Sequence, residues 1–160
     1  MSRKIARWAL LTALALALAW LESLLPAFGM LPGMKLGLGN IVVLFALYRM
    51  SLKDAAGLAL VKALLTAACF GNAYSFAYSL AGAALSLAAM AALKGLDWFS
   101  MVGVSAAGGV CHNLGQLLVA AAVLRTAGLG WYFPVLLVSG TVTGIGTGIA
   151  GGLIVRRVKM

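Results

Sequence analysis

Three hydrogen-bonding side chains stand close together in an otherwise apolar stretch of the chain. His112, Asn113 and Gln116 lie within residues 103–124, a segment long and apolar enough to cross a bilayer. In a helix His112 and Gln116 are one turn apart, and Asn113 lies beside them. Because lipid cannot solvate polar groups, this side of the helix should face protein or a wet cavity. The cluster therefore indicates either a ligand site or a hydrogen-bonded contact between helices.

A lysine, Lys62, lies at the centre of a second apolar run, residues 55–70. A lysine at this depth is costly unless it finds a partner or water. Three interpretations are open: the side chain extends to an interface, it pairs with Glu22, or it faces an outer vestibule with Lys35 and attracts an anion. We favour a small, anionic ligand held between Lys62 and the polar cluster, below residues 26–39.

The sequence argues against catalysis by this chain alone. Its three acidic residues, Glu22, Asp54 and Asp97, are too far apart along the expected helices to bind magnesium or to act as an acid and base pair. Cys69 and Cys111 lack metal-ligand spacing, and there is no Walker loop. We therefore expect no catalytic residue, no metal, no cofactor and no enzyme activity in the chain itself.

The composition is that of an integral membrane protein. Of the 160 residues, 64% are hydrophobic and only 9% are charged, and the mean hydropathy is +1.08. The first apolar run resembles a signal peptide in its basic start, but it continues to Leu25 and lacks a good cleavage site, so we expect a first membrane helix. The sequence predicts an all-α bundle of about six transmembrane helices forming one domain, residues 1–160. The expected helices span about residues 5–25, 37–50, 54–70, 74–94, 101–125 and 132–155.

The basic residues predict how the chain lies in the membrane. The net charge of +9 is spread between apolar runs, so we interpret it as a topology signal and expect no nucleic acid partner. With the N-terminus inside, nine basic residues fall on the cytoplasmic side, and only Lys35 and Arg125 fall outside. Both termini are therefore expected in the cytoplasm of a bacterial cell, with the chain in the inner or plasma membrane. Residues 26–39 and 71–75 then face outward, and further expected binding residues lie in or near them: Lys35, Asn40, Asn72 and Tyr78.

Two stripes of small residues permit close helix packing. Ala9, Ala13 and Ala17 recur every four residues in the first helix, and glycines recur likewise from Gly140 to Gly152 in the last. Small residues at this spacing let two helices approach closely in a membrane. For the glycines we favour packing within the bundle over a partner surface. The alanines offer the same choice, and we expect them to dock a partner in the membrane.

Three strings resemble a known family: LPGMKLGLGNIVVLFAL, FGNAYSFAYSLAGAALSL and GVSAAGGVCHNLGQLLVA. They look like the Gx transporter family, often labelled heptaprenyl diphosphate synthase component I, over nearly the whole chain after about residue 25. That family is grouped with the S components of energy-coupling-factor (ECF) transporters. The resemblance implies an S-component-like bundle that binds a solute in an outward pocket and docks on an ECF T subunit and ATPase subunits through small residues of its first helix.

Three functions remain open from the sequence. The first is a subunit that binds a vitamin-related or an isoprenoid- or quinone-related solute for uptake. The second is a non-catalytic accessory subunit of a heptaprenyl or polyprenyl diphosphate synthase, acting with a soluble polyprenyl synthase. Prenyl elongation needs aspartate-rich motifs that hold magnesium, and the sequence has none, so this chain would not be the catalytic subunit. The third is a structural scaffold, which predicts that the buried polar groups bond one another and leave no cavity.

Overall fold

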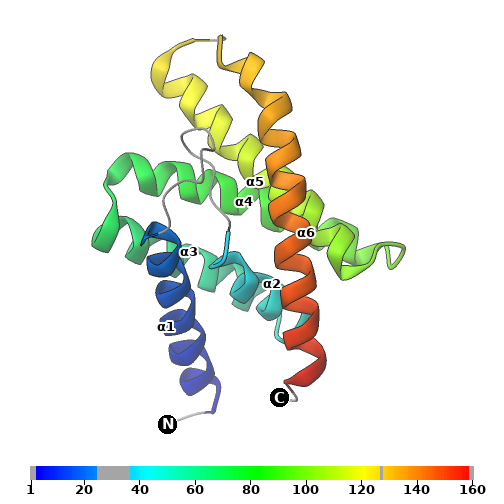
Figure 1. Ribbon diagram of the computed structural model, residues 1–160. Helices are drawn as coiled ribbons and strands as arrows, with labels where there is room; N and C mark the ends of the chain where they lie inside the picture. Colours follow the sequence, from blue (N-terminus) through cyan, green and yellow to red (C-terminus); the bar gives the residue numbers. More distant parts are fainter. Residues whose placement is uncertain (1–2, 25–36, 127, 159–160) are drawn as a thin grey trace.

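The computed structural model describes residues 3–24, 37–126 and 128–158, and these residues form helices without any strand. Figure 1 shows that α1 begins and α6 ends at the same end of the molecule. The helix expected from residue 37 begins instead at Asn40, because Gly37 has a positive φ of 72° and starts a turn. The elements are α1 (Arg3–Leu24), α2 (Asn40–Arg49), α3 (Leu52–Phe70), α4 (Ala73–Gly95), α5 (Met101–Leu124), the 3-10 helix η1 (Gly128–Tyr132) and α6 (Phe133–Arg157).

Among the described residues, four helices are long and apolar enough to cross a membrane: α1, α4, α5, and α6 together with η1. The fold is therefore that of an all-helical, multi-pass membrane protein. The other two α-helices, α2 and α3, do not meet these criteria of length and composition. Helix α2 has only 10 residues, and α3 has 19 residues but carries Lys53, Asp54 and Lys62. Six crossings and two cytoplasmic termini stay predictions.

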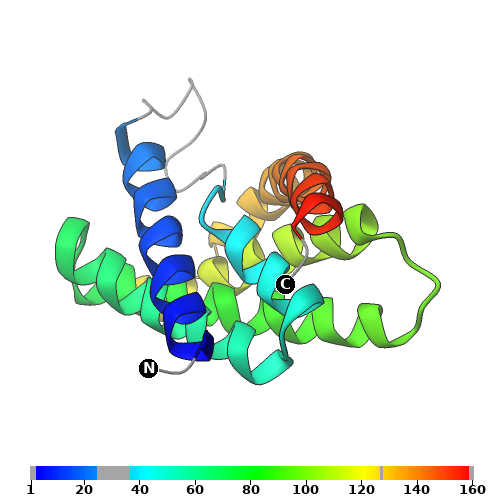
Figure 2. The same ribbon diagram turned by 90° about the horizontal axis from the view of Figure 1, so that it is seen from below.

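The short helix α2 forms the centre of the core. All residues from Ile41 to Leu47 are buried, on every side of the helix. Figure 2 shows α2 between α1 and α6, and it also contacts α3. A helix that is apolar all round is stable only when other elements cover it. Helices α1, α3 and α6 therefore pack around α2, whose first residue, Asn40, is held beside α3.

Helices α4, α5 and α6 approach one another through glycine. A Cβ atom on Gly109 of α5 would lie 2.2 Å from the carbonyl oxygen of Gly140 in α6, so only glycine permits this crossing. Similarly, a Cβ atom on Gly115 would lie 2.6 Å from the carbonyl oxygen of Ala81 in α4. The preference for packing of the glycine ladder within the bundle is confirmed, because its members from Gly140 to Gly148 face the backbone of α5.

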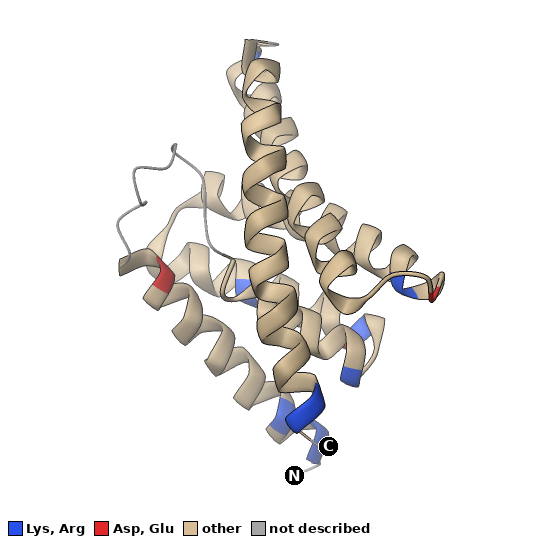
Figure 3. Ribbon diagram, turned by 45° about the vertical axis from the view of Figure 1, so that its right-hand side comes forward, with Lys and Arg blue, Asp and Glu red and all other residues tan. Residues whose placement is uncertain are grey.

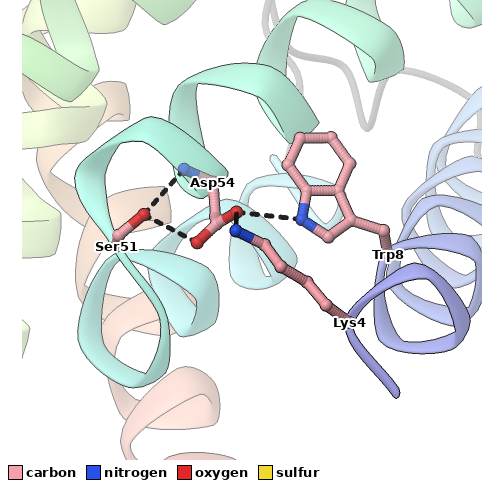
Figure 4. A network of polar contacts seen from close by, with 4 residues as sticks. All are labelled: Lys4, Trp8, Ser51 and Asp54. Carbon is pink, nitrogen blue, oxygen red and sulfur yellow. Dashed lines mark hydrogen bonds and ion pairs between the residues drawn. The ribbon is translucent and has the colours of Figure 1, made fainter. Parts of the chain in front are cut away.

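Helix α1 is fastened to α3 by a polar network (Figure 4). The indole Nε1 of Trp8 donates to Oδ1 of Asp54 at 3.0 Å, and the Lys4 ammonium lies 3.0 Å from the same oxygen. The Ser51 hydroxyl donates to the other oxygen, Oδ2, at 2.6 Å. The Ser51 hydroxyl and then the Lys4 ammonium lower the pKa of the largely buried Asp54 carboxyl to about 2, because both favour its charged form.

The opposite side of α1 carries the alanine stripe. Ala9, Ala13 and Ala17 are all exposed, whereas Leu11 and Ala15 face the core. Several lysine and arginine residues lie at the end of the molecule where α1 begins and α6 ends (Figure 3). The exposed stripe therefore runs along a helix whose first turns are basic.

Candidate ligand cavity

All six α-helices or the turns before them contribute to a cavity of about 170 Å³. At roughly 30 Å³ for each water molecule, this is room for about six waters or one compact solute. Much of the wall is polar, which is unusual between apolar membrane helices. Its polar lining residues are Glu22, Ser23, Asn40, Lys62, Thr66, Ser75, Ser79, His112, Asn113, Gln116 and Thr143.

The structure brings the expected cluster on α5 and two other expected residues to this cavity. His112, Asn113 and Gln116 line it from α5, as their spacing of one turn predicts. Lys62 lines it from α3, and Asn40 lines it from the start of α2. These residues come from three helices and are far apart in the sequence, with Asn40 and Lys62 separated by 22 positions. They nevertheless line the same cavity. That they bind a solute stays a prediction.

Lys62 is held at the start of α2. Its ammonium donates a hydrogen bond to the side-chain oxygen of Asn40. The stem of the lysine passes Gly39, where a Cβ atom would lie 3.2 Å from Lys62 Cδ and 3.3 Å from the carbonyl oxygen of Ala15. Gly39 therefore lets α1 and the lysine side chain meet at this point. The ammonium and the positive end of α2 both bring positive charge to this part of the wall, and the Glu22 carboxylate lies in the same cavity.

Glu22 brings a carboxylate to the same cavity from α1. Its Oε1 accepts a hydrogen bond of 2.6 Å from the backbone N–H of Gly37, which has left-handed backbone. Glu22 thereby fixes the turn that leads into α2. The sequence suggested Glu22 only as a partner for Lys62. No pattern in the neighbouring residues predicted its hydrogen bond to a backbone amide.

The three polar residues of α5 have different surroundings. Asn113 donates from its amide nitrogen to the carbonyl oxygen of Leu136 at 2.8 Å and to the Ser139 hydroxyl at 3.2 Å, so it joins α5 to α6. The ring of His112 packs against Gly82, where a Cβ atom would lie 2.9 Å from Cε1. The Gln116 amide makes no hydrogen bond within the described part of the chain. Asn113 thus makes the hydrogen-bonded contact between helices, while the ligand-site interpretation stays a prediction for His112 and Gln116.

The remaining expected residues lie elsewhere. Asn72 is the N-cap of α4 and accepts from the Ser75 N–H at 2.9 Å, which is a structural role. Tyr78 belongs to α4 but is not among the residues that line the cavity. Lys35 falls outside the described residues. The docking residues Ala9, Ala13 and Ala17 are exposed on α1, as described above.

Several hydroxyl groups of the lining were not anticipated. Thr66 follows Lys62 by one turn of α3, and that spacing is the signal by which it was predictable. Its hydroxyl is buried and has no hydrogen-bond partner among the described residues. Ser75 and Ser79 are likewise one turn apart on α4. No comparable spacing pointed to Thr143 of α6. It lies among the glycines from Gly140 to Gly152, for which packing within the bundle was the favoured interpretation.

The fold and this cavity define a class: a helical membrane protein with a polar, solute-sized cavity between its helices. The chain belongs to the family described as Heptaprenyl diphosphate synthase component I, which matches residues 11–154. Searches of curated proteins and of solved structures find no match. The family resemblance noted in the sequence is thus confirmed, while its grouping with ECF S components stays a prediction.

Proposed function

We propose that the chain is the solute-binding membrane subunit of an uptake transporter and takes a small anionic solute from the outer side. The observation that carries this proposal is the polar cavity, with Lys62 and the N-terminus of α2 on one wall. A negative group placed there is favoured by a full positive charge and by the helix dipole. A scaffold needs no such space, so the cavity argues against the purely structural alternative.

The proposal includes an arrangement in the membrane. All six helices would cross or enter the bilayer, both termini would be cytoplasmic, and the cavity would open toward the outside of a bacterial cell. The alanine stripe of α1 would dock an ECF T subunit, which works with ATPase subunits. Its exposure supports this role, because small residues that already packed inside the bundle would be unavailable to a partner.

A second candidate is a non-catalytic accessory subunit of a heptaprenyl or polyprenyl diphosphate synthase. The family description favours it directly, since a component I implies a second component. In that case a soluble polyprenyl synthase would supply the magnesium-binding aspartates. The described residues contain no group of three or more side chains of the kind that holds a metal ion.

Purification in mild detergent separates the two candidates. The protein and its Lys62→Met variant are prepared in parallel from the same host, and the small molecules released by denaturation are identified by mass spectrometry. The transporter proposal expects an anionic solute with the unmodified protein that is depleted in the variant. A soluble polyprenyl synthase that co-purifies in fixed proportion, without any such solute, would favour the second candidate.

A further inference from the structure

A second, smaller chamber of about 30 Å³ adjoins the ligand cavity, between α2, α4, α5 and α6. The two spaces share part of their walls. A volume of this size admits one water molecule or one chemical group of similar size. The residues that line both are Gly37, Asn40, Gly109 and Thr143, and the other polar residues of the chamber are Ser86, Ser105 and Thr147.

Three hydroxyl groups of the chamber already donate their hydrogen atoms in hydrogen bonds within the protein. Thr143 donates to the carbonyl oxygen of Ser139 at 2.9 Å, and Thr147 donates to that of Gly144 at 3.0 Å. The oxygens of Ser105 and Thr147 are 2.9 Å apart. Because each hydroxyl has one hydrogen, and that of Thr147 is used, Ser105 is the donor in this pair. These oxygens therefore have only acceptor capacity left.

The fourth hydroxyl belongs to Ser86, a buried residue that lines the chamber, and it makes no hydrogen bond to the described residues. It is able to rotate and to accept or donate as its surroundings require. Ser86 and the acceptor oxygens can therefore form hydrogen bonds to a group that carries N–H or O–H, whereas a methyl group of the same size could form none.

We propose that the cavity and the chamber form one site for a compact solute with an anionic group at Lys62 and an amino or hydroxyl group in the chamber. This inference rests on the proposed solute-binding function and specifies its substrate class. It disfavours a polyisoprenoid, because the combined space is small and many of its lining residues are polar, whereas a prenyl chain requires a long apolar groove.

The test uses two series of probes with the full-length protein in detergent. One series consists of ω-amino carboxylates from glycine to 6-aminohexanoate, and the other consists of the carboxylates in which methyl replaces the ammonium group. Affinities are measured by ligand-dependent thermal shift and by calorimetry. The variants are Thr147→Val and Ser105→Ala, which remove chamber oxygens. The matched control is Thr141→Val, on the same helix α6 but outside both linings.

The proposal expects one length of amino carboxylate to bind at least about tenfold more tightly than its methyl partner. Thr147→Val or Ser105→Ala should abolish this difference and leave the affinity of the methyl partner unchanged, while Thr141→Val has no effect. Equal affinities in the two series, as expected if the chamber holds only ordered water, would overturn the inference and leave the anion site at Lys62 intact. Failure of both series to bind would overturn it together with the proposed function.

Discussion

The indole ring of Trp8 in α1 lies against Gly57 in α3, so closely that a Cβ atom on Gly57 would be 2.2 Å from the ring. The ring is unable to move aside cheaply, because its Nε1 is hydrogen bonded to Asp54. This fit places α1 on α3, below the cavity wall that Glu22 and Lys62 form.

Gly57→Ala should therefore loosen α1. Alanine favours helix formation by up to about 1 kcal/mol, but overpacking against Trp8 costs about 1–3 kcal/mol, so a net destabilisation is expected. Thermal unfolding in detergent measures the change. The matched control is Gly146→Ala on α6, where no atom lies within 4 Å of the added Cβ and stability should hold or rise. Equal behaviour of the two variants would contradict the assigned contact.

The attachment of α1 should depend on pH through Asp54. Its pKa is lowered to about 2 from 3.8, so its stabilising effect is complete above about pH 4 and is lost as the pH falls toward 2. Asp54→Asn should lower the thermal stability at pH 7, where the Lys4 ion pair exists in the unmodified protein. The difference between variant and unmodified protein should shrink on acidification. A difference that stays constant between pH 7 and pH 3 would exclude this linkage.

Lys62→Met should weaken solute binding without unfolding the protein. Loss of a charge-assisted contact lowers affinity by a factor of about ten or more, while removal of a charge from an apolar bundle leaves folding nearly unchanged or improves it. Titration with the carboxylates described above gives the affinity, and thermal shift gives the stability. Lys53→Met, an exposed change on the same helix, is the control. If Lys62→Met unfolds the protein while affinity per folded molecule persists, Lys62 is structural.

His112→Ala and Gln116→Ala should also weaken solute binding, but by less than Lys62→Met, and the same titration measures their affinities. Neutral hydrogen bonds contribute about 0.5–1.5 kcal/mol net, so each variant should lose less affinity than Lys62→Met. His112 also packs against Gly82, so its replacement leaves a space between α4 and α5. Its effect on stability should therefore exceed that of Gln116→Ala.

Ala13→Trp should block assembly with a T-type partner and leave solute binding by the isolated subunit intact. Ala13 is exposed in the middle of the stripe, where a large ring would hold a second helix away. Co-purification with the partner measures assembly. Val142→Trp, at an exposed position of α6, is the control for a bulky residue facing lipid. Normal assembly of Ala13→Trp would place the docking surface elsewhere.

The topology is tested by reporter fusions. A fusion after Arg157 should report a cytoplasmic end, and one within residues 26–39 should report the outside, because nine basic residues are expected inside and two outside. An external C-terminus would require an odd number of crossings and would overturn the predicted arrangement.

Helical periodicity predicted the parts of the site that lie on one helix. The spacing of His112 and Gln116 sufficed to place them on one side of α5. Contacts between distant segments left no local signal. The bond from Gly37 to Glu22 depends on a turn with positive φ, and the acceptor chamber depends on Ser105 and Thr147 meeting across a glycine-lined crossing. Such pairings follow from tertiary packing.

The burial of α2 on every side has a consequence for the substitutions that this chain tolerates. Along α6, buried and exposed positions alternate with helical period, so a scan of all substitutions should find tolerant positions on the lipid side of each turn. From Ile41 to Leu47 no residue faces outward. The same scan should therefore find α2 to be an unbroken block of sensitive positions, with the constraint of a protein interior rather than that of a membrane helix.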